Sequence, residues 1–414
     1  MIELGLSRIA QLVKHTPLSW KAIHVAGTNG KGSITAYLSA LLKEAGVVTG
    51  RFNSPHLIDR WDCISIQDQP VSKKVFTQVE DEVKGRDEKY RICASEFELL
   101  TATAFEIFNR AHVQVGVVEV GLGGRLDATN ILRPQDVLVS VISKIGLDHQ
   151  TLLGQTPEAI AGEKAGIMKE AVPCIVDGTN ESSVLQVLHE HAKRVKTTLS
   201  VINPETAPHT MKMLEPFVQN LDMAPHQQAN LFLAIEAARA AESSLRPKKP
   251  VDQSLDVISR VTWPGRLQIV SLQPLLGYDI TVLLDGAHNV QAAKSLAVYV
   301  DQRIRQQSGS VTWILAASKG KDLLELLSCI LKPQDNVIAT AFGPVDGMPW
   351  VEPVDTGKIV QAARRVSEEI KITATKTVEE ALCGLSELHR AAPVVVTGSL
   401  YLVSDVLRLL RASK

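Results

Sequence analysis

The seven residues GTNGKGS, at positions 27–33, lie between an apolar run typical of a strand and a segment with helical periodicity. Ile23 and Val25 belong to the apolar run, and Ile34 and Leu38 begin the helical one. Successive backbone N–H groups followed by a helix N-terminus form a binding site for anions. The motif therefore predicts a phosphate-binding loop after the first strand of an α/β domain.

The motif differs in one place from the usual P-loop, G-x-x-x-x-G-K-[ST], because Gly32 follows Lys31 and the hydroxyl comes at Ser33. A tight turn without chemistry is the alternative. A turn needs neither a lysine between two glycines nor a hydroxyl at the start of a helix, so we favour a nucleotide phosphate. The predicted phosphate ligands are Gly27, Thr28, Asn29, Gly30, Lys31, Gly32 and Ser33.

The length of 414 residues exceeds that of one ordinary hydrophobic core, so two domains are expected. The 44 basic and 45 acidic side chains nearly cancel, which argues against a nucleic-acid partner and favours small molecules. The five cysteines are scattered without a metal or disulfide pattern, which indicates a reducing compartment. Since we find neither a signal peptide nor a membrane span, we expect a cytoplasmic monomer that binds no membrane.

Apolar runs alternate with helical patterns in two separate sets, which predicts two α/β domains built on parallel sheets. The expected strands of the first set are 23–27, 113–120, 137–142 and 174–176, and the second set begins near Asp279. Pro264 and Gly265 interrupt both patterns. We therefore predict a P-loop ATPase-like domain at 1–263 and a Rossmann-like domain at 264–414, with the substrate cleft between them.

Glu119 stands at the end of a buried apolar run, just before a glycine-rich stretch. Ligands of parallel sheets collect at the carboxyl ends of the strands. A buried carboxylate needs a cation, and next to a nucleotide phosphate the natural cation is Mg²⁺. A salt bridge between Glu119 and Arg125 is the alternative.

The next predicted strand leads into Leu147, Asp148 and His149. A lone histidine is more often a core or surface residue than a ligand. The position of His149 next to the strand of Glu119 makes it a candidate metal ligand.

Thr156 and Pro157 begin a predicted helix whose apolar stripe includes Ile160 and Ile167. Lys164 falls on the same stripe. Desolvation lowers the pKa of a lysine and leaves a neutral amine, which can react with CO₂ to form an anionic carbamate. The alternative is a lysine whose ammonium group extends from the edge of the stripe to solvent.

Two further motifs are weaker taken singly. SEFE at 95–98 is a capping box, and we interpret it as structural. LLDGAHN again places polar side chains, Asp285, His288 and Asn289, directly after a strand.

Nine motifs in order resemble the folate branch of the Mur ligase superfamily, the dihydrofolate synthase and folylpolyglutamate synthase group. The resemblance covers nearly the whole chain. The motifs are GTNGKGS (27–33), SPHL (54–57), EVGLGGRLDATN (119–130), LDH (147–149), EKAGI (163–167), HQxxN (226–230), PGR (264–266), DGAHN (285–289) and TGSLYLV (397–403).

The resemblance implies an ATP-dependent amide ligase, in which ATP converts a carboxylate to an acyl phosphate and the amine of L-glutamate displaces the phosphate. It implies that the 27–33 loop holds the phosphates and that Lys31 counters their charge. Ser54 and Glu119 would hold a first Mg²⁺, and His149 a second one, steadied by carbamylated Lys164. The residues that would reach ATP are Asn230, Arg266, Asp285 and His288.

For the acceptor we expect dihydropteroate, as in a monofunctional dihydrofolate synthase of the fungal type. The chain is compact, begins at its first helix, and reads IDRWDCI after SPHL, unlike many polyglutamylating relatives. Folylpolyglutamate synthase, or an enzyme with both activities, is the alternative. A non-catalytic nucleotide switch would not need Lys164 on a buried face.

Overall fold

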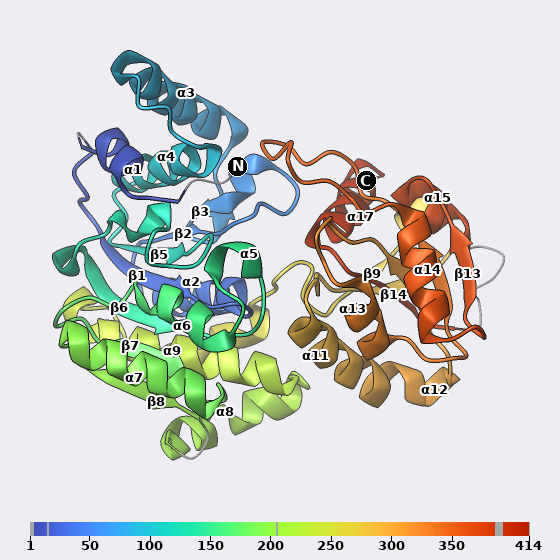
Figure 1. The fold of residues 1–414 in the computed structure, drawn as a ribbon. Coiled ribbons are helices and arrows are strands. Elements are labelled where there is room, and N and C mark those ends of the chain that lie inside the picture. Colours follow the sequence, from blue (N-terminus) through green and yellow to red (C-terminus); the bar gives the residue numbers. More distant parts are fainter. Residues whose placement is uncertain (1–3, 15, 204–205, 386–391, 414) are drawn as a thin grey trace. The chain divides into compact units, whose positions relative to one another are not determined.

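The computed structural model describes residues 4–14, 16–203, 206–385 and 392–413. The chain forms two compact units (Figure 1), unit 1 from Met1–His56 with Trp61–Thr262, and unit 2 from Leu57–Arg60 with Trp263–Lys414. Each unit has a mostly parallel sheet. The predicted α/β fold class is therefore confirmed. The ranges 1–263 and 264–414 stay a prediction for the functional domains.

The sheet of unit 1 has the strand order β4-β3-β2-β5-β1-β6-β7-β8 in the described residues. The strands from β2 to β8 in this order are parallel, and β3 and β4 add an antiparallel edge. The strands are β1 Lys21–Ala26, β2 Thr49–Phe52, β3 Ile64–Ile66, β4 Gln69–Pro70, β5 Val115–Glu119, β6 Val137–Ile142, β7 Cys174–Asp177 and β8 Leu199–Ile202.

The helices of unit 1 cover both faces of this sheet (Figure 1). They are α1 Ser7–Leu12, α2 Lys31–Glu44, α3 Lys73–Tyr90, α4 Glu96–Arg110, α5 Gln150–Leu153, α6 Pro157–Ala165, α7 Ser182–Val195, α8 Pro208–Asn220 and α9 Pro225–Leu245, with short 3₁₀ turns η1 Arg60–Cys63, η2 Ala128–Ile131, η3 Pro134–Asp136 and η4 Val251–Arg260.

Alternate residues of the central strands supply the two cores. Ile23 and Val25 of β1 pack with α2 and α9 on one face, whereas Ala22 packs with α4 on the other. The helix starts follow the sequence signals: Ser95 and Glu98 form the expected capping box, and the Thr156 hydroxyl caps α6. These elements bring the carboxyl ends of β1, β5 and β6 to one edge of the sheet.

Unit 2 has a six-stranded sheet in the order β13-β12-β11-β14-β10-β9, in which β9 alone is antiparallel among the described strands. Helices α11, α13 and α14 pack on one face, and α15 and α17 on the other. The elements are β9 Gln268–Ser271, α10 Gln273–Leu276, β10 Thr281–Leu284, α11 Val290–Val300, the π-helix η5 Asp301–Arg305, α12 Gln306–Ser308, β11 Thr312–Leu315, α13 Leu323–Ile330, β12 Asn336–Ala339, α14 Thr356–Val366, β13 Lys371–Ala374, α15 Val378–Cys383, β14 Val394–Thr397 and α17 Leu400–Ala412.

A short piece of the N-terminal half, Leu57–Arg60, belongs to unit 2. Arg411 of α17 pairs with the Asp59 carboxylate, with Nη2 at 3.1 Å from Oδ1. Arg408 of the same helix donates to the backbone oxygen of Ile58 at 3.1 Å. Leu57 packs against the apolar cluster of α17. Unit 2 is therefore not one continuous stretch of chain.

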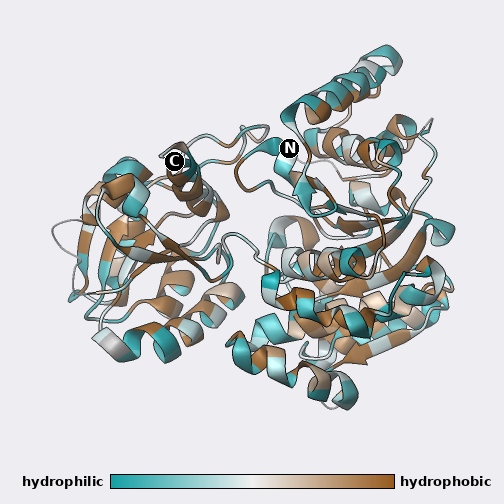
Figure 2. Ribbon diagram, turned by 180° about the vertical axis from the view of Figure 1, so that it is seen from behind, coloured by the Kyte–Doolittle hydropathy of each residue, from teal (hydrophilic) through white to brown (hydrophobic). Residues whose placement is uncertain are grey.

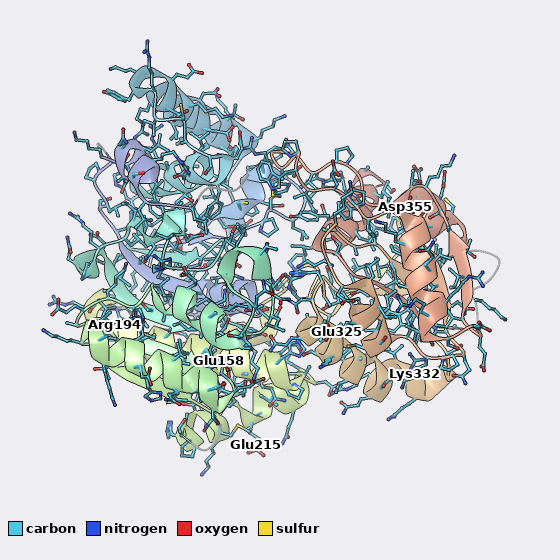
Figure 3. All side chains as sticks on the ribbon, in the orientation of Figure 1. Glu158, Arg194, Glu215, Glu325, Lys332 and Asp355 are labelled. Carbon is cyan, nitrogen blue, oxygen red and sulfur yellow. The ribbon has the colours of Figure 1, made fainter. Side chains whose placement is uncertain are left out.

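The strands of both sheets are mostly hydrophobic, and the outer sides of the helices are more hydrophilic (Figure 2). Charged side chains such as Arg194, Glu215, Glu325 and Asp355 lie exposed on the helical layers (Figure 3). Among the described residues, we find no helix with the length and apolar character that crossing a membrane requires.

Candidate active site

The predicted phosphate loop connects β1 to α2. Gly30 caps α2 in the left-handed conformation, with φ 91°, and Gly27 has φ 152°. A Cβ on Gly27 would lie 1.8 Å from Ser143 Oγ, and one on Gly30 would lie 2.2 Å from Asn230 Oδ1. Both positions therefore require glycine, for conformation and for space.

The end of β6 and the residues after it hold this loop in place. The backbone oxygen of Lys144 accepts from the N–H of Thr28 at 2.9 Å and of Asn29 at 3.2 Å. Ser143 Oγ donates to the Asn29 oxygen at 2.7 Å. The first N–H groups of α2, from Lys31 to Ser33, have no partners within the helix by its geometry. The loop thus presents these N–H groups from a fixed frame, as an anion site needs.

Two lysines meet at one carbonyl of the loop. Lys31 Nζ donates to the Gly27 oxygen at 3.2 Å and to the Thr28 oxygen at 3.3 Å, and Lys164 Nζ donates to the Gly27 oxygen at 2.9 Å. Lys164 is only 4% exposed, so its amine does not extend to solvent. The structure therefore brings the two predicted lysines together.

Burial lowers the pKa of Lys164 to about 7, and the nearby Lys31 ammonium contributes in the same direction. The carboxylates of Asp148 and Asp127 oppose the shift. Near neutral pH, a large fraction of the Lys164 side chain is therefore the neutral amine.

Glu119 is the last residue of β5 and is 6% exposed. Its Oε1 lies 3.8 Å from Lys31 Nζ, and its Oε2 accepts from Asn53 Nδ2 at 2.7 Å. The Asn53 amide also donates to Thr35 Oγ1 at 2.6 Å. Arg125, the alternative partner, forms an ion pair with Glu163 at 2.9 Å.

Asn53 is a site residue that the sequence analysis missed. It lies between the end of β2 and Ser54. Its position directly before the SPHL motif is the feature of the sequence that could have pointed to it. Its amide bridges β5 to the first turns of α2 and holds the Glu119 carboxylate in one orientation.

The environment of the Ser54 hydroxyl is compatible with its predicted role as a metal ligand. Its Oγ is buried and has no hydrogen-bond partner among the described residues. Within the described ranges, no three His, Cys, Asp or Glu side chains gather in a way that could hold a metal ion. A hydroxyl and one carboxylate next to a phosphate loop fit Mg²⁺, which takes its other ligands from phosphate and water.

His149 follows Asp148, whose carboxylate acts on the pKa of Lys164. It is exposed, has φ 49°, and precedes the short helix α5. Its backbone N–H donates to Asp148 Oδ1 at 2.9 Å. Its role as a second metal ligand stays a prediction.

Asn230 of α9 is 6% exposed and lies against Gly30, as the close approach of its Oδ1 shows. The helix α9 packs along α2, so an apolar contact between two helices fixes this amide at the phosphate loop. Asn230 is thus placed beside the predicted phosphate ligands.

In unit 2 the predicted residues gather around Gly286, after β10. Asp285 is 8% exposed, and its carboxylate accepts from the N–H of Leu267 and of Ala287, both at 2.9 Å. His288 Nδ1 lies 2.9 Å from the Gly286 oxygen. A Cβ on Gly286 would lie 2.3 Å from Arg266 Nη1. In this unit the PGR and DGAHN motifs therefore form one cluster.

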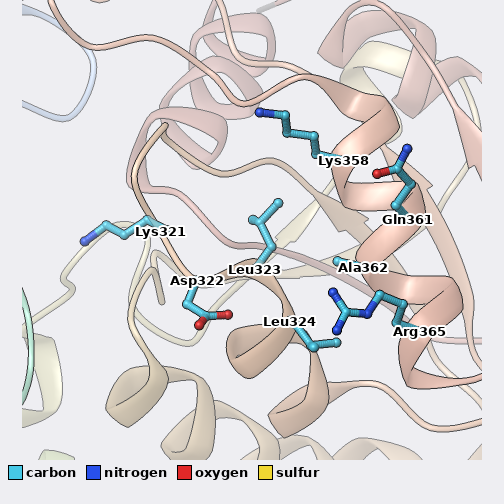
Figure 4. A pocket seen from close by; sticks show the side chains of 8 residues that line it. All are labelled: Lys321, Asp322, Leu323, Leu324, Lys358, Gln361, Ala362 and Arg365. Carbon is cyan, nitrogen blue, oxygen red and sulfur yellow. The ribbon is translucent and has the colours of Figure 1, made fainter.

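A pocket of unit 2 lies elsewhere, between α13 and α14 (Figure 4). Its volume is about 320 Å³. None of the predicted site residues lines it. The lining residues are Lys321, Asp322, Leu323, Leu324, Lys358, Gln361, Ala362 and Arg365.

Comparison with known proteins identifies the family. The sequence model described as "Dihydrofolate synthetase, C-terminal domain" matches residues 268–409. The chain is 40% identical to a protein of Schizosaccharomyces pombe named "Probable dihydrofolate synthetase", over 99% of both chains. It is 34% identical to "Dihydrofolate synthetase" of Saccharomyces cerevisiae, over 99% of this chain and 98% of the relative.

The chain belongs to the dihydrofolate synthase and folylpolyglutamate synthase family. Solved structures of the family share its fold. E. coli FolC in complex with DHPP and ADP matches with a TM-score of 0.79 and 26% identity, over 99% of this chain and 94% of that chain. A bifunctional folylpolyglutamate synthase/dihydrofolate synthase with Mn, AMPPNP and L-glutamate bound matches with a TM-score of 0.76 and 27% identity, over 99% of this chain and 95% of that chain.

Membership in this family accounts for the coincidence of motifs in unit 1. Three residues that are far from the 27–33 loop in the sequence lie against it in the structure: Glu119, Lys164 and Asn230. The contact of Lys164 with Gly27 and the contacts of Glu119 with Lys31 and Asn53 join these motifs into one arrangement.

Proposed function

We propose that this chain is a dihydrofolate synthase, an ATP-dependent ligase that joins L-glutamate to dihydropteroate. Two fungal relatives that match the chain over nearly its full length carry that name. The observation that carries the proposal is the loop at 27–33, with Lys31 and Glu119 3.8 Å apart at its edge. This arrangement suits the transfer of a phosphoryl group, because cationic and backbone N–H groups stabilise the charge that moves.

In the proposed reaction, an oxygen of the pteroate carboxylate attacks the γ-phosphorus of ATP, and ADP leaves. The amine of L-glutamate then attacks the acyl phosphate, phosphate leaves, and the amine loses a proton as the amide forms. The N–H groups at the start of α2 bind phosphate oxygens. The Lys31 ammonium gives up its hydrogen bonds to the Gly27 and Thr28 oxygens and donates instead to the oxygens of the phosphoryl group that is transferred.

Solved relatives contain ADP, or AMPPNP with Mn, which supports ATP and a divalent metal for this chain. We propose that Ser54 and Glu119 hold the first Mg²⁺ and that His149 holds a second. The metal would neutralise phosphate charge. Asn53 would keep the Glu119 carboxylate oriented toward it.

We further propose that Lys164 carries a carbamate. Its neutral amine attacks CO₂, the C–N bond forms, and one proton is released. The new anion would lie next to the Lys31 ammonium. The buried site and the lowered pKa of Lys164 support this chemistry.

Asn230, Arg266, Asp285 and His288 are proposed to contact ATP, as the resemblance implies. The Asp285 carboxylate accepts from the N–H groups of Leu267 and Ala287, so it also orders the backbone around Gly286. We also keep a cytoplasmic, monomeric enzyme with small-molecule partners as part of the proposal.

The deciding experiment is a competition between acceptors. Purified protein with MgATP and L-glutamate should convert dihydropteroate to dihydrofolate far faster than it extends tetrahydrofolate monoglutamate. A site shaped for the benzoate carboxylate would have to bury an extra glutamate carboxylate without a dedicated cation. Mass analysis should show one added glutamate. Efficient formation of di- and triglutamates would instead support folylpolyglutamate synthase.

Phosphate release distinguishes a ligase from a nucleotide switch. A ligase should release phosphate only when pteroate and glutamate are both present. Slow hydrolysis of ATP that is independent of both substrates would contradict the proposed activity.

A further inference from the structure

Two polar side chains, the buried Asn130 and the half-buried Lys169, are hydrogen-bonded to each other near the end of α6. Asn130 ends the glycine-rich stretch that follows β5 and is 7% exposed. Its Nδ2 donates to the backbone oxygen of Arg125 at 3.0 Å and to that of Gly166 at 3.1 Å. Its Oδ1 accepts from Lys169 Nζ at 2.7 Å. One amide therefore joins the stretch after β5 to the end of α6, and a lysine holds that amide.

The two segments that Asn130 joins are in direct contact at Lys164. The N–H of Arg125 donates to the Glu163 oxygen at 2.8 Å. A Cβ on Gly124 would lie 2.9 Å from the Lys164 oxygen and 3.0 Å from its Cα. A Cβ on Gly166 would lie 2.5 Å from the Arg125 Cα. The backbone of Lys164 therefore rests on Gly124, and its side chain reaches the phosphate loop on the other side.

The stretch after β5 is itself anchored to the sheet. Asp127 accepts from the N–H of Leu122 at 2.7 Å and of Thr129 at 3.0 Å. Thr129 Oγ1 lies 2.9 Å from Nε2 of His24, which is fully buried in β1. Strand β1 leads into the phosphate loop. Through His24 it therefore also supports the stretch after β5, against which the Lys164 backbone packs.

We propose that Asn130 and Lys169, which we name the Asn130 latch, are positioning residues that set the distance from Lys164 to the phosphate loop. The latch fixes the last turn of α6 against Gly124. Without it, α6 keeps its apolar packing on β6 and β7, but its last turn is free to move away from Gly124 and to expose the Lys164 amine. Lys164 is then no longer held at the Gly27 oxygen.

The charges around the latch are compatible with this role. Burial lowers the pKa of Lys169 to about 8, and Lys169 donates to Asn130 as an ammonium or as a neutral amine. Its charge also contributes to the low pKa of His24. The charged groups that act on Lys164 are Lys31, Asp148 and Asp127. Lys169→Met leaves all three in place, whereas Asn130→Asp adds a carboxylate near the end of α6, so Lys169→Met is the variant that separates the position of Lys164 from its electrostatics.

Two variants test the latch, with one control. Asn130→Asp keeps the size and the acceptor for Lys169 but removes both N–H donors to the backbone. Lys169→Met keeps the aliphatic stem and removes the cation that orients Asn130. Lys193→Met is the matched control, because Lys193 is an exposed lysine of α7.

The first measurement is the labelling of lysines by limiting acetic anhydride in CO₂-depleted buffer, quantified by mass spectrometry against the exposed Lys14. In the wild type, Lys164 should be protected. Both latch variants should label Lys164 several-fold faster, with Asn130→Asp the stronger, while the control should match the wild type. This measurement does not depend on the proposed ligase activity or on the carbamate, so those proposals can fail separately.

The second measurement is kinetic and rests on the proposed function. A small displacement of an active-site group costs rate more than affinity, so kcat for dihydrofolate formation should fall by about 10- to 100-fold with little change in the KM for ATP. Melting temperatures are recorded in parallel. Variants that melt lower but keep wild-type labelling of Lys164 and wild-type kcat would overturn the latch. If Asn130→Asp does not fold, Lys169→Met alone decides.

Discussion

At the scale of single residues, the centre of the site is one carbonyl oxygen. The oxygen of Gly27 accepts from Lys31 and from Lys164, so two lysine nitrogens approach the same point. Two ammonium groups there would repel each other, and the desolvated Lys164 has the lower pKa. An anion on Lys164 would turn this repulsion into attraction.

This charge arrangement leads to a prediction for Lys164→Ala. The variant should fold and lose most of its ligase activity, because both the amine and the carbamate are gone. Acetate or formate should restore part of the activity by occupying the vacant anion site. The control Lys193→Ala should keep wild-type ligase activity, and acetate or formate should not raise it. Mass spectrometry that finds only a free amine on Lys164 in active, CO₂-equilibrated enzyme would contradict the carbamate.

Glu119→Gln tests the first metal site. The amide keeps the shape and a contact with Asn53, but it cannot neutralise Mg²⁺ or Lys31. We expect an unchanged fold and a loss of activity of about 10- to 100-fold or more, with weaker Mg²⁺ dependence. Glu80→Gln is the control and should keep activity. Glu80 is a buried glutamate of α3 that pairs with Lys84. Full activity of Glu119→Gln at saturating Mg²⁺ would rule out this role.

His24 makes the stability of the fold depend on pH. Burial lowers its pKa from 6.5 to about 3, with a smaller contribution from Lys169. The unfolded chain therefore binds one more proton than the folded chain between these values. As the pH falls below 6.5, folding should lose about 1.4 kcal/mol per pH unit from this residue.

Urea unfolding at pH 7, 6 and 5 measures this effect. His24→Gln should flatten the pH dependence relative to the wild type, whereas His189→Gln, at an exposed histidine of α7, should leave it unchanged. Equal slopes for His24→Gln and the wild type would show that the buried ring is not responsible.

The sequence predicted the residues whose chemistry is unusual for their pattern, such as Lys164 on an apolar stripe. It did not predict Asn53 or His24. An asparagine after a strand and a histidine within one have ordinary local contexts, and their roles arise only from partners 66 and 105 positions away. No local pattern encodes such long-range contacts.

At the scale of elements, the glycines of the phosphate loop are the most sensitive positions. Gly30 combines a φ of 91° with an approach of Asn230 that leaves no room for a Cβ. Gly30→Ala should therefore lower the free energy of unfolding by about 1–3 kcal/mol and weaken ATP binding. The double variant with Asn230→Ala should recover part of the stability, since it removes the clash but not the backbone strain.

Gly162→Ala is the control for this prediction. Gly162 lies in α6 with no atom within 4 Å of an added Cβ, so alanine should be neutral or stabilise by up to about 1 kcal/mol. Denaturant titration measures all three variants. A Gly30→Ala protein as stable as the wild type would show that the loop adapts.

The elements with strong patterns were predicted well. The strand expected at 137–142 is β6, and the helix starts at Ser95 and Thr156 are as expected. The strand β2, with the sequence TGRF, was not predicted. It is short, and Gly50 and Arg51 hide its pattern. Its position between β3 and β5 depends on tertiary packing, in which the ring of Phe108 covers Gly50.

At the scale of the whole molecule, the two units have separate cores, each with its own buried tryptophan. Trp20 packs against Phe105 and Phe108 in unit 1, and Trp313 is fully buried in unit 2. Separate cores predict separate unfolding transitions, which the two tryptophans can report.

Asp335 is the residue that tests this independence. It is fully buried and accepts from Arg305 Nη2, Trp313 Nε1 and the N–H of Lys332 at 2.9 Å each, and from the N–H of Val311 at 3.0 Å. Asp335→Asn removes the buried carboxylate partner of Arg305 and leaves the more exposed Asp301 as its remaining ion-pair partner among the described residues. We expect unit 2 to lose about 3–5 kcal/mol.

Urea titrations of variants in which Trp20 or Trp313 is the single tryptophan, the other four being replaced by phenylalanine, measure the two units. Asp335→Asn should shift the transition seen by Trp313 and leave that of Trp20 unchanged. Asp301→Asn, which removes a more exposed partner of Arg305, should have an effect below about 1 kcal/mol. An equal shift of both transitions would contradict independent cores.

The segment Leu57–Arg60 has a consequence for exchanging parts between relatives. A gene fragment that begins at Trp263 encodes every strand of the second sheet, yet it omits Asp59, whose carboxylate pairs with Arg411, and the carbonyl that Arg408 binds. A chimera made at a single crossover therefore combines four residues of one parent with a C-terminal helix of the other. Only a recombination that carries this tetrapeptide together with α17 transfers unit 2 intact.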